Sequence, residues 1–230
     1  MAKQNFWDAI SSAAPAPLAT AQPSLVPFGP MSFEPRAEYQ GDNKALYTFD
    51  QAQASVARRS LALPTFRQVM ELVLIPLLED KLDESQKAVA RNMLASYGEW
   101  NDTALYRQLG VVFRANGIQG LIWNADANAY DARDMMVDDV QLYAARNLEA
   151  GWNPLKKVAK TAPELVADLY SRPFDNLPRQ MRENAGLYLP PEDVVRPVGR
   201  GGYGGGVGVD YGAGTVCSVR AARGAKKNVP

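Results

Sequence analysis

The chain has 230 residues, and its 25 basic and 25 acidic side chains leave it without net charge. This length suits one domain of good size or one domain with extended arms, and the neutral balance excludes a global attraction to nucleic acid or anionic membranes. Histidine is absent and Cys217 is the only cysteine. These counts exclude a cysteine/histidine zinc site, an intramolecular disulfide and catalysis by imidazole.

The first 45 residues predict an extended N-terminal arm. No charged side chain occurs from 9 to 33, and five prolines in that stretch remove backbone donors and block regular structure. Disordered tails are usually charged and poor in large apolar residues, so this apolar segment is expected to lie on a neighbouring subunit; a linker with incidental apolar residues is the alternative. The residues expected to make the contact are Leu18, Leu25, Val26, Phe28, Met31 and Phe33.

Residues 46–189 predict an all-α body, a helical bundle. Apolar residues recur at helical spacing, and capping residues, glycines and prolines separate the segments. Alternation with a period of two, which is typical of strands, is almost absent before residue 190. The expected helices span about 50–63, 66–82 with a kink at Pro76, 83–95, 103–115, 118–150, 155–160, 163–170 and 175–184.

The longest expected helix covers about 118–150. Apolar or small residues occur there in alternating steps of four and three, which is the heptad pattern of a helix seam. The small side chains permit close helix approach, so the seam packs either within the subunit or between subunits of a homo-oligomer. The seam consists of Ile118, Ile122, Ala125, Ala129, Ala132 and Met136.

Residues 190–230 predict a Pro/Gly-rich basic tail. Its Arg-Gly-Gly-Tyr segment resembles the arginine- and glycine-rich segments of RNA-binding proteins, which implies weak contact with DNA or RNA; a flexible linker with a soluble end is the other interpretation. The basic residues of the tail are Arg200, Arg220, Arg223, Lys226 and Lys227. The glycines of 199–204 also match the letters of a dinucleotide-binding motif, but neither a buried strand before them nor a helix after them is expected, so no cofactor is predicted.

Acidic residues of the expected long helix are the remaining candidates for chemistry. Asp134 and Asp138 share a face and could hold a divalent ion, but a solvated polar face explains them better in a chain without histidine. Neither a metal site nor a catalytic residue is predicted, and we expect the protein not to be an enzyme.

The plan of extended arm, helical body with one rod and glycine-rich tail resembles the small internal virion proteins of short-tailed bacteriophages, which are ejected with the genome. It is also similar in plan to phage head-to-tail connector proteins. The resemblance implies a non-enzymatic structural protein that is made in the host cytoplasm and assembles in the virion, in multiple copies near the portal or tail, with portal, tail or capsid proteins as partners. The N-terminus lacks the apolar core of a signal peptide, and no run approaches the roughly 20 apolar residues of a membrane span. The alternative function is a cytoplasmic nucleic-acid-binding accessory protein that acts through the basic tail.

Overall fold

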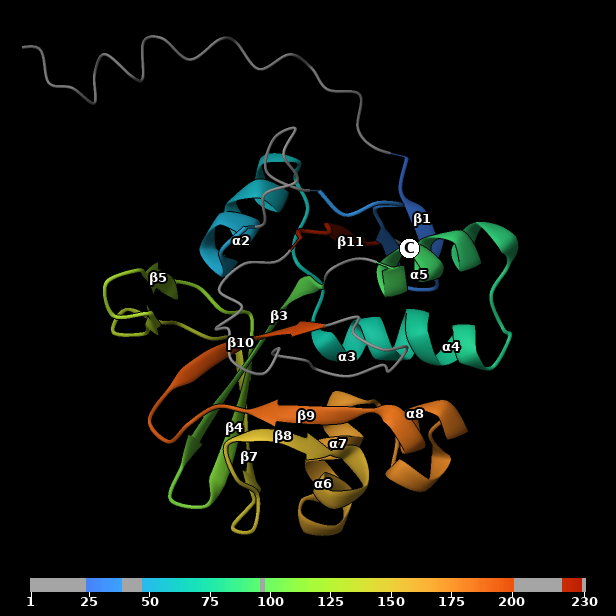
Figure 1. Ribbon diagram of the computed structural model, residues 1–230. Coiled ribbons are helices and arrows are strands. Elements are labelled where there is room, and N and C mark those ends of the chain that lie inside the picture. Colours follow the sequence, from blue (N-terminus) through green and yellow to red (C-terminus); the bar gives the residue numbers. More distant parts are fainter. Residues whose placement is uncertain (1–23, 39–46, 96–97, 201–220, 229–230) are drawn as a thin grey trace, which may run out of the picture.

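The structure is a computed structural model that describes residues 24–38, 47–95, 98–200 and 221–228 (Figure 1). It is a mixed α/β protein with 34% strand in four sheets and 33% helix among these residues. The expected all-α bundle is therefore wrong. The helices agree closely with expectation in several places, whereas most of the error lies between residues 99 and 150.

A four-stranded antiparallel sheet forms the centre of the molecule, in the order β10-β3-β4-β7. Strands β3 and β4 form a hairpin, and Leu109 and Gly110 make its turn with φ angles of 48° and 78°. Two positive φ angles in a two-residue turn match the right-handed twist of the strands that it joins. The strands are β3 (Glu99–Gln108), β4 (Val111–Asn116), β7 (Asp139–Ala144) and β10 (Val195–Arg200).

The expected helix at 103–115 is wrong, because this segment is the β3–β4 hairpin. Leu105, Leu109 and Val112 recur at helical spacing, but Leu105 and Val112 are buried from two different strands and Leu109 is 84% exposed at the turn. Strand β3 is buried on both faces along much of its length. Such a strand does not show the alternation by which strands are recognised.

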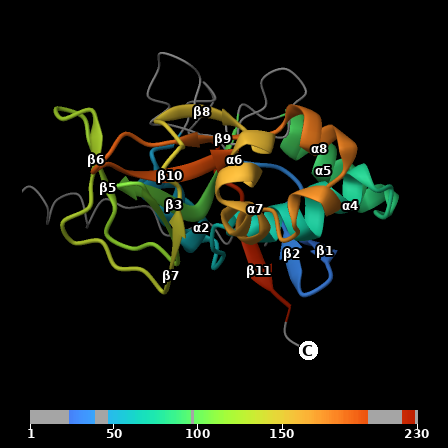
Figure 2. The ribbon, with the colours of Figure 1, turned by 90° about the horizontal axis from the view of Figure 1, so that it is seen from below.

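The expected long helix at 118–150 is also wrong. The segment forms the hairpin of β5 (Ile122–Asn124) and β6 (Ala129–Asp131), then a loop, and then β7. Gly117, Gly120 and Asn128 have φ angles of 64°, 73° and 48°, which a helix cannot contain. The β5–β6 hairpin stands out from the body in both views (Figures 1 and 2).

The helices form where capping signals are strong. Thr65 accepts a hydrogen bond from the Gln68 amide, and the Gln68 side chain bonds back to the Thr65 amide, which is a capping box. A π-helical stretch, Met70–Leu74, precedes Pro76, whose ring removes one backbone donor from the helix. The remaining helical elements are α2 (Phe49–Arg58), α3 (Phe66–Val69), α4 (Ile75–Leu78), α5 (Glu84–Ala95), α6 (Leu155–Thr161), α7 (Pro163–Leu169), the 3₁₀ helix η2 (Phe174–Asn176) and α8 (Arg179–Asn184).

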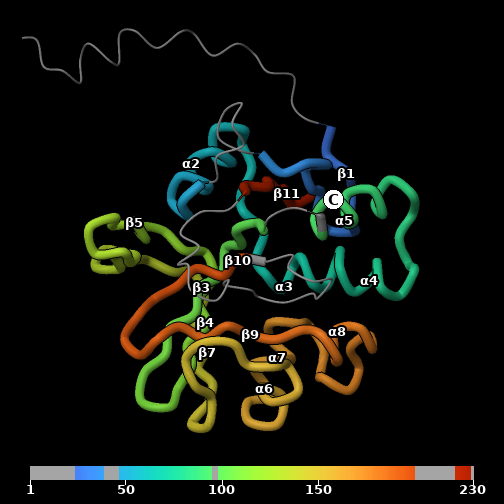
Figure 3. The backbone as a smooth tube through the Cα atoms, in the orientation of Figure 1, coloured from blue at the N-terminus to red at the C-terminus, as the bar shows by residue number. Residues whose placement is uncertain are grey.

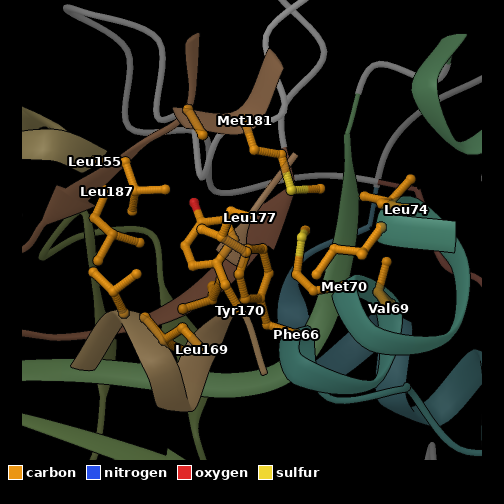
Figure 4. Packing of buried hydrophobic residues seen from close by; sticks show 14 of the residues in the cluster. Phe66, Val69, Met70, Leu74, Leu155, Leu169, Tyr170, Leu177, Met181 and Leu187 are labelled. Carbon is orange, nitrogen blue, oxygen red and sulfur yellow. The ribbon is translucent and has the colours of Figure 1, made fainter. Parts of the chain in front are cut away.

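The main core lies between the central sheet and the helices. Phe66 of α3 packs edge-to-face on Tyr170 at the end of α7, with ring centroids 5.5 Å apart (Figure 4). Leu105 of β3 and Val112 of β4 belong to the same cluster and are the contribution of the sheet to this core. Strands β8 (Gly151–Pro154) and β9 (Gly186–Leu189) pair with each other, and Leu187 and Leu189 of β9 add to this core. None of the described helices is long and apolar enough to cross a bilayer.

The two ends of the described chain meet in a three-stranded sheet, β1-β2-β11 (Figure 3). Its strands are β1 (Val26–Phe28), β2 (Met31–Phe33) and β11 (Ala225–Lys227). Phe28, Met31 and Phe33, which were expected to contact a neighbouring subunit, are buried in the main core of their own chain. Leu25 and Val26 are half-buried, and Leu18 lies outside the described residues.

Candidate binding face of the central sheet

One face of the central sheet is closed by the helices. Arg114 of β4 is buried there, and its Nε donates to Asp168 Oδ2 of α7 at 2.6 Å. Its Nη1 donates to Asp139, and this bond lowers the pKa of the Asp139 carboxyl. Burial raises the pKa of Tyr143 on the same face to about 12, assisted by its bond to Asp168. These contacts fasten β4 and β7 to α7.

The opposite face is only partly covered. Successive side chains of a strand point to opposite faces, so residues that alternate with the buried set lie here. At one end α2 and the β5–β6 hairpin cover the face through edge-to-face contacts between Phe49, Trp100 and Tyr130, with centroids 5.8 to 6.5 Å apart. The remainder, which we call the open face, consists of Tyr106, Phe113, Val140, Leu142 and Val195, with the buried Ala104 and Ala115 at its boundary with the covered end.

The open face forms the floor of a pocket of about 430 Å³ beneath the segment 132–137. Tyr106 and Phe113 lie side by side there, with ring centroids 5.4 Å apart. At the rim, the Tyr106 hydroxyl and the Gln108 amide both donate to Asp193 Oδ1, at 3.0 and 3.1 Å. The lining residues are Ala104, Leu105, Tyr106, Gln108, Phe113, Ala115, Ala132, Met135, Val137, Val140 and Val195. The pocket is therefore apolar, with polar groups confined to one edge.

The two edges of the sheet differ in how they are protected. Strand β10 contains Pro197 and a register shift between Pro197 and Gly199, both of which discourage pairing with another chain. Strand β7 is the opposite edge, and after Asp139 at its start it has neither a charged residue nor a proline. Val140 is 41% and Leu142 60% exposed on this strand. Edge strands that expose apolar side chains in this way are sites of association.

The expected helix seam is dispersed. Ile118 is buried under α2, Ala132 lines the pocket, and Ile122 and Met136 are exposed on separate segments. Ala125 lies in the turn between β5 and β6, and Ala129 is in β6. Because the segment is not helical, these residues share no stripe along which a second helix could pack.

The basic tail is divided by the fold. Arg223 is 1% exposed, and its guanidinium donates to Glu99 of β3 and to Asn92 of α5, so it cannot reach a phosphate while the protein is folded. Lys226 and Lys227 are exposed on β11. Arg220 and the side chain of Arg200 lie outside the described residues. Contact with nucleic acid stays an untested prediction for the tail.

The open face provides apolar surface that a bound partner would remove from water, rather than reactive groups. Its pocket is lined by aliphatic and aromatic side chains with one hydroxyl and one amide, which suits the burial of apolar side chains. Asp134 and Asp138 are exposed, and within the described ranges no group of three acidic or cysteine side chains could hold a metal ion.

No known protein family matches the chain, and no curated protein or solved structure shows significant similarity to it. The geometry of the open face and of its β7 edge is therefore the basis for assigning a function.

Sequence reasoning missed the open face because it placed these residues in helices. The missed residues are Tyr106, Phe113, Val140 and Leu142. Two signals could have found them. Leu109-Gly110 directly before Val111-Val112 is typical of a hairpin turn entering a strand, and Val140-Gln-Leu-Tyr alternates in the manner of an edge strand with one apolar face.

Proposed function

We propose that the protein is a non-enzymatic assembly component that works in multiple copies and uses the open face and the β7 edge as its contact surface. The observation that carries this proposal is the exposure of Val140 and Leu142 on an edge strand that has no charged residue or proline after Asp139. A monomeric protein normally protects such an edge from pairing with another chain, as this chain does at β10. The apolar pocket beside the edge adds surface that a partner would remove from water.

The proposed setting is a phage virion, near the portal or tail, with portal, tail or capsid proteins as further partners. The rod-like helix no longer supports that setting, because it does not form. What supports it is the combination of an association surface with an uncharged, proline-rich segment at 9–23. Both features suit a protein that works among many neighbours.

Sedimentation equilibrium of the full chain over a range of concentrations tests the assembly role. The expected result is reversible association, with a mass that rises above that of one 25.1 kDa chain. A chain that stays monomeric at every concentration and does not copurify with virus particles from infected cells would contradict the proposal. Association without copurification would keep the assembly role and reject the virion setting.

A further inference from the structure

The backbone groups on the free side of β7 can be assigned from the ladder with β4. Ala145 donates its N–H to Gly110 O at 2.7 Å, so this pair is hydrogen-bonded. In an antiparallel ladder, hydrogen-bonded pairs alternate with pairs whose groups point the other way. Val140, Leu142 and Ala144 therefore direct their N–H and C=O groups away from β4. Among the described residues no strand pairs with this side.

We propose that two copies of the chain join through β7, antiparallel and centred on Leu142, so that two four-stranded sheets continue as one. This inference rests on the proposed assembly function and names the partner as a second copy. The two-fold axis would pass between Leu142 and Leu142 of the second copy. Val140 of each copy would then lie opposite Ala144 of the other.

The register follows from the faces of the sheet. Residues directly opposite each other in an antiparallel pair lie on the same face. A register that set Val140 or Leu142 opposite Gln141 or Tyr143 would mix the open face with the face closed by α7, so those registers are excluded. The remaining symmetric registers near the centre of β7 have their axis at Gln141, Leu142 or Tyr143.

Charge selects the centre at Leu142. This register places Asp138 of each copy, in the bend just before β7, near Arg146 of the other, in the turn just after it, so that two equivalent ion pairs can form at the two ends of the junction. Centring on Gln141 brings Asp138 beside Ala144 instead, and centring on Tyr143 carries it past Arg146. Only the Leu142 register pairs opposite charges while it also pairs apolar residues with one another.

Asp138 and Arg146 have the charges that such a junction needs. Both are exposed, and within the described residues neither takes part in an ion pair. Asp138 also lies close enough to Asp102 to raise the pKa of that carboxyl, which burial raises most. The Asp138 carboxylate thus has no cation beside it among the described residues, and the guanidinium of a second copy would supply one.

Cysteine cross-linking tests the register. In a background with Cys217→Ser, the variant Leu142→Cys sets two thiols at the axis, where hydrogen-bonded pairs have Cα atoms about 5.5 Å apart, a separation that a disulfide spans. Mild oxidation is expected to yield a linked dimer. Val140→Cys and Ala144→Cys chains should cross-link when mixed and not when alone. Leu109→Cys, which is even more exposed and lies at the β3–β4 turn away from the axis, is the control for random collision.

Charge exchange tests the ends of the junction. Asp138→Arg and Arg146→Asp, each alone, replace two attractions by two repulsions and are expected to weaken the dimer about tenfold or more. The double variant restores both ion pairs and is expected to associate like the native chain. Circular dichroism on each variant checks that the monomer remains folded.

The outcomes separate this inference from the proposed function. Cross-linking at Leu142 no faster than at Leu109, or a double variant no stronger than the single ones, would overturn the β7 junction. If the native chain still associates in that case, the assembly role stands and another surface or residues 1–23 make the contact. A native chain that never associates would overturn both.

Discussion

Arg223 and Glu99 form a two-bond ion pair between residues 124 positions apart in the sequence. Arg223 Nε lies 2.9 Å from Glu99 Oε2, and Nη2 lies 2.8 Å from Oε1. The same guanidinium donates to the carbonyl of Glu34 and to Asn92 Oδ1. One side chain near the end of the described chain thus fastens the central sheet, the β1–β2 hairpin and α5 to one another.

Arg223→Met is expected to lower the free energy of unfolding by about 3–5 kcal/mol, because it leaves the buried Glu99 carboxylate without its cation. Adding Glu99→Gln should recover part of the loss. Urea unfolding measures both. Arg179→Met is the matched control, since its pair with Glu183 is exposed and worth at most about 1 kcal/mol. Equal losses for Arg223→Met and Arg179→Met would contradict this role.

Phe33→Ala is expected to cost about 3–5 kcal/mol, because the ring is fully buried in the main core and packs edge-to-face on Phe28. Leu109→Ala, at an exposed turn, should change stability by about 0.5 kcal/mol or less. Thermal or urea unfolding distinguishes the two. If Phe33 instead contacted a neighbouring subunit, its substitution would change the mass in solution and leave the monomer's stability intact.

Tyr143→Phe is expected to reduce the loss of stability at alkaline pH. The pKa of Tyr143 is raised to about 12 in the folded protein, against about 10 in the unfolded chain. Its neutral hydroxyl therefore stabilises the fold below pH 10, and this contribution is lost as the pH rises from about 10 to about 12. The free energy of unfolding should fall less between about pH 9 and pH 11 in the variant.

Some alkaline sensitivity should remain in the Tyr143→Phe variant. Burial also raises the pKa of Tyr170, whose hydroxyl donates to Gly186 O at 3.3 Å in the core. An alkaline loss of the same size in the native chain and in Tyr143→Phe would show that Tyr143 does not contribute.

Replacing Lys226 and Lys227 with glutamine tests the alternative function. A truncation at residue 190 would not do so, because it removes β10, β11 and Arg223 along with the basic residues. The alternative predicts weaker binding to single-stranded DNA and a salt dependence shallower by about 0.7 for each lost contact. If our proposal is correct, neither the native chain nor the glutamine variant binds single-stranded DNA measurably in a titration at physiological salt.

Helices were predicted well where local signals decide them. The start of the helix after Thr65, the start of α5 after Asp83 and the start of α7 at Pro163 depend on a few neighbouring residues, so the sequence displays them. The first helix begins at Phe49 with Thr48 as its cap and not at Asp50, and it ends at Arg58 instead of near Leu63. The last expected helix is divided into η2 and α8.

The strands were missed because tertiary contacts decide them. Ala125, Ala129 and Ala132 favour a helix by local preference, yet Tyr130 between them packs on Trp100 and Phe49, and this contact requires the β5–β6 hairpin. The candidate face could not be predicted for the same reason. Tyr106 and Phe113 come together only through the β3–β4 register.

The pairing of β2 with β11 also determines when the protein can finish folding. Phe33 leaves the ribosome early in synthesis, but its strand partner Ala225 is made nearly two hundred residues later. Until residues 221–228 emerge, the β1–β2 hairpin lacks its third strand and the buried carboxylate of Glu99 lacks Arg223. Closure of a loop this long slows folding, so we expect the nascent chain to become resistant to proteolysis only after the last strand is added.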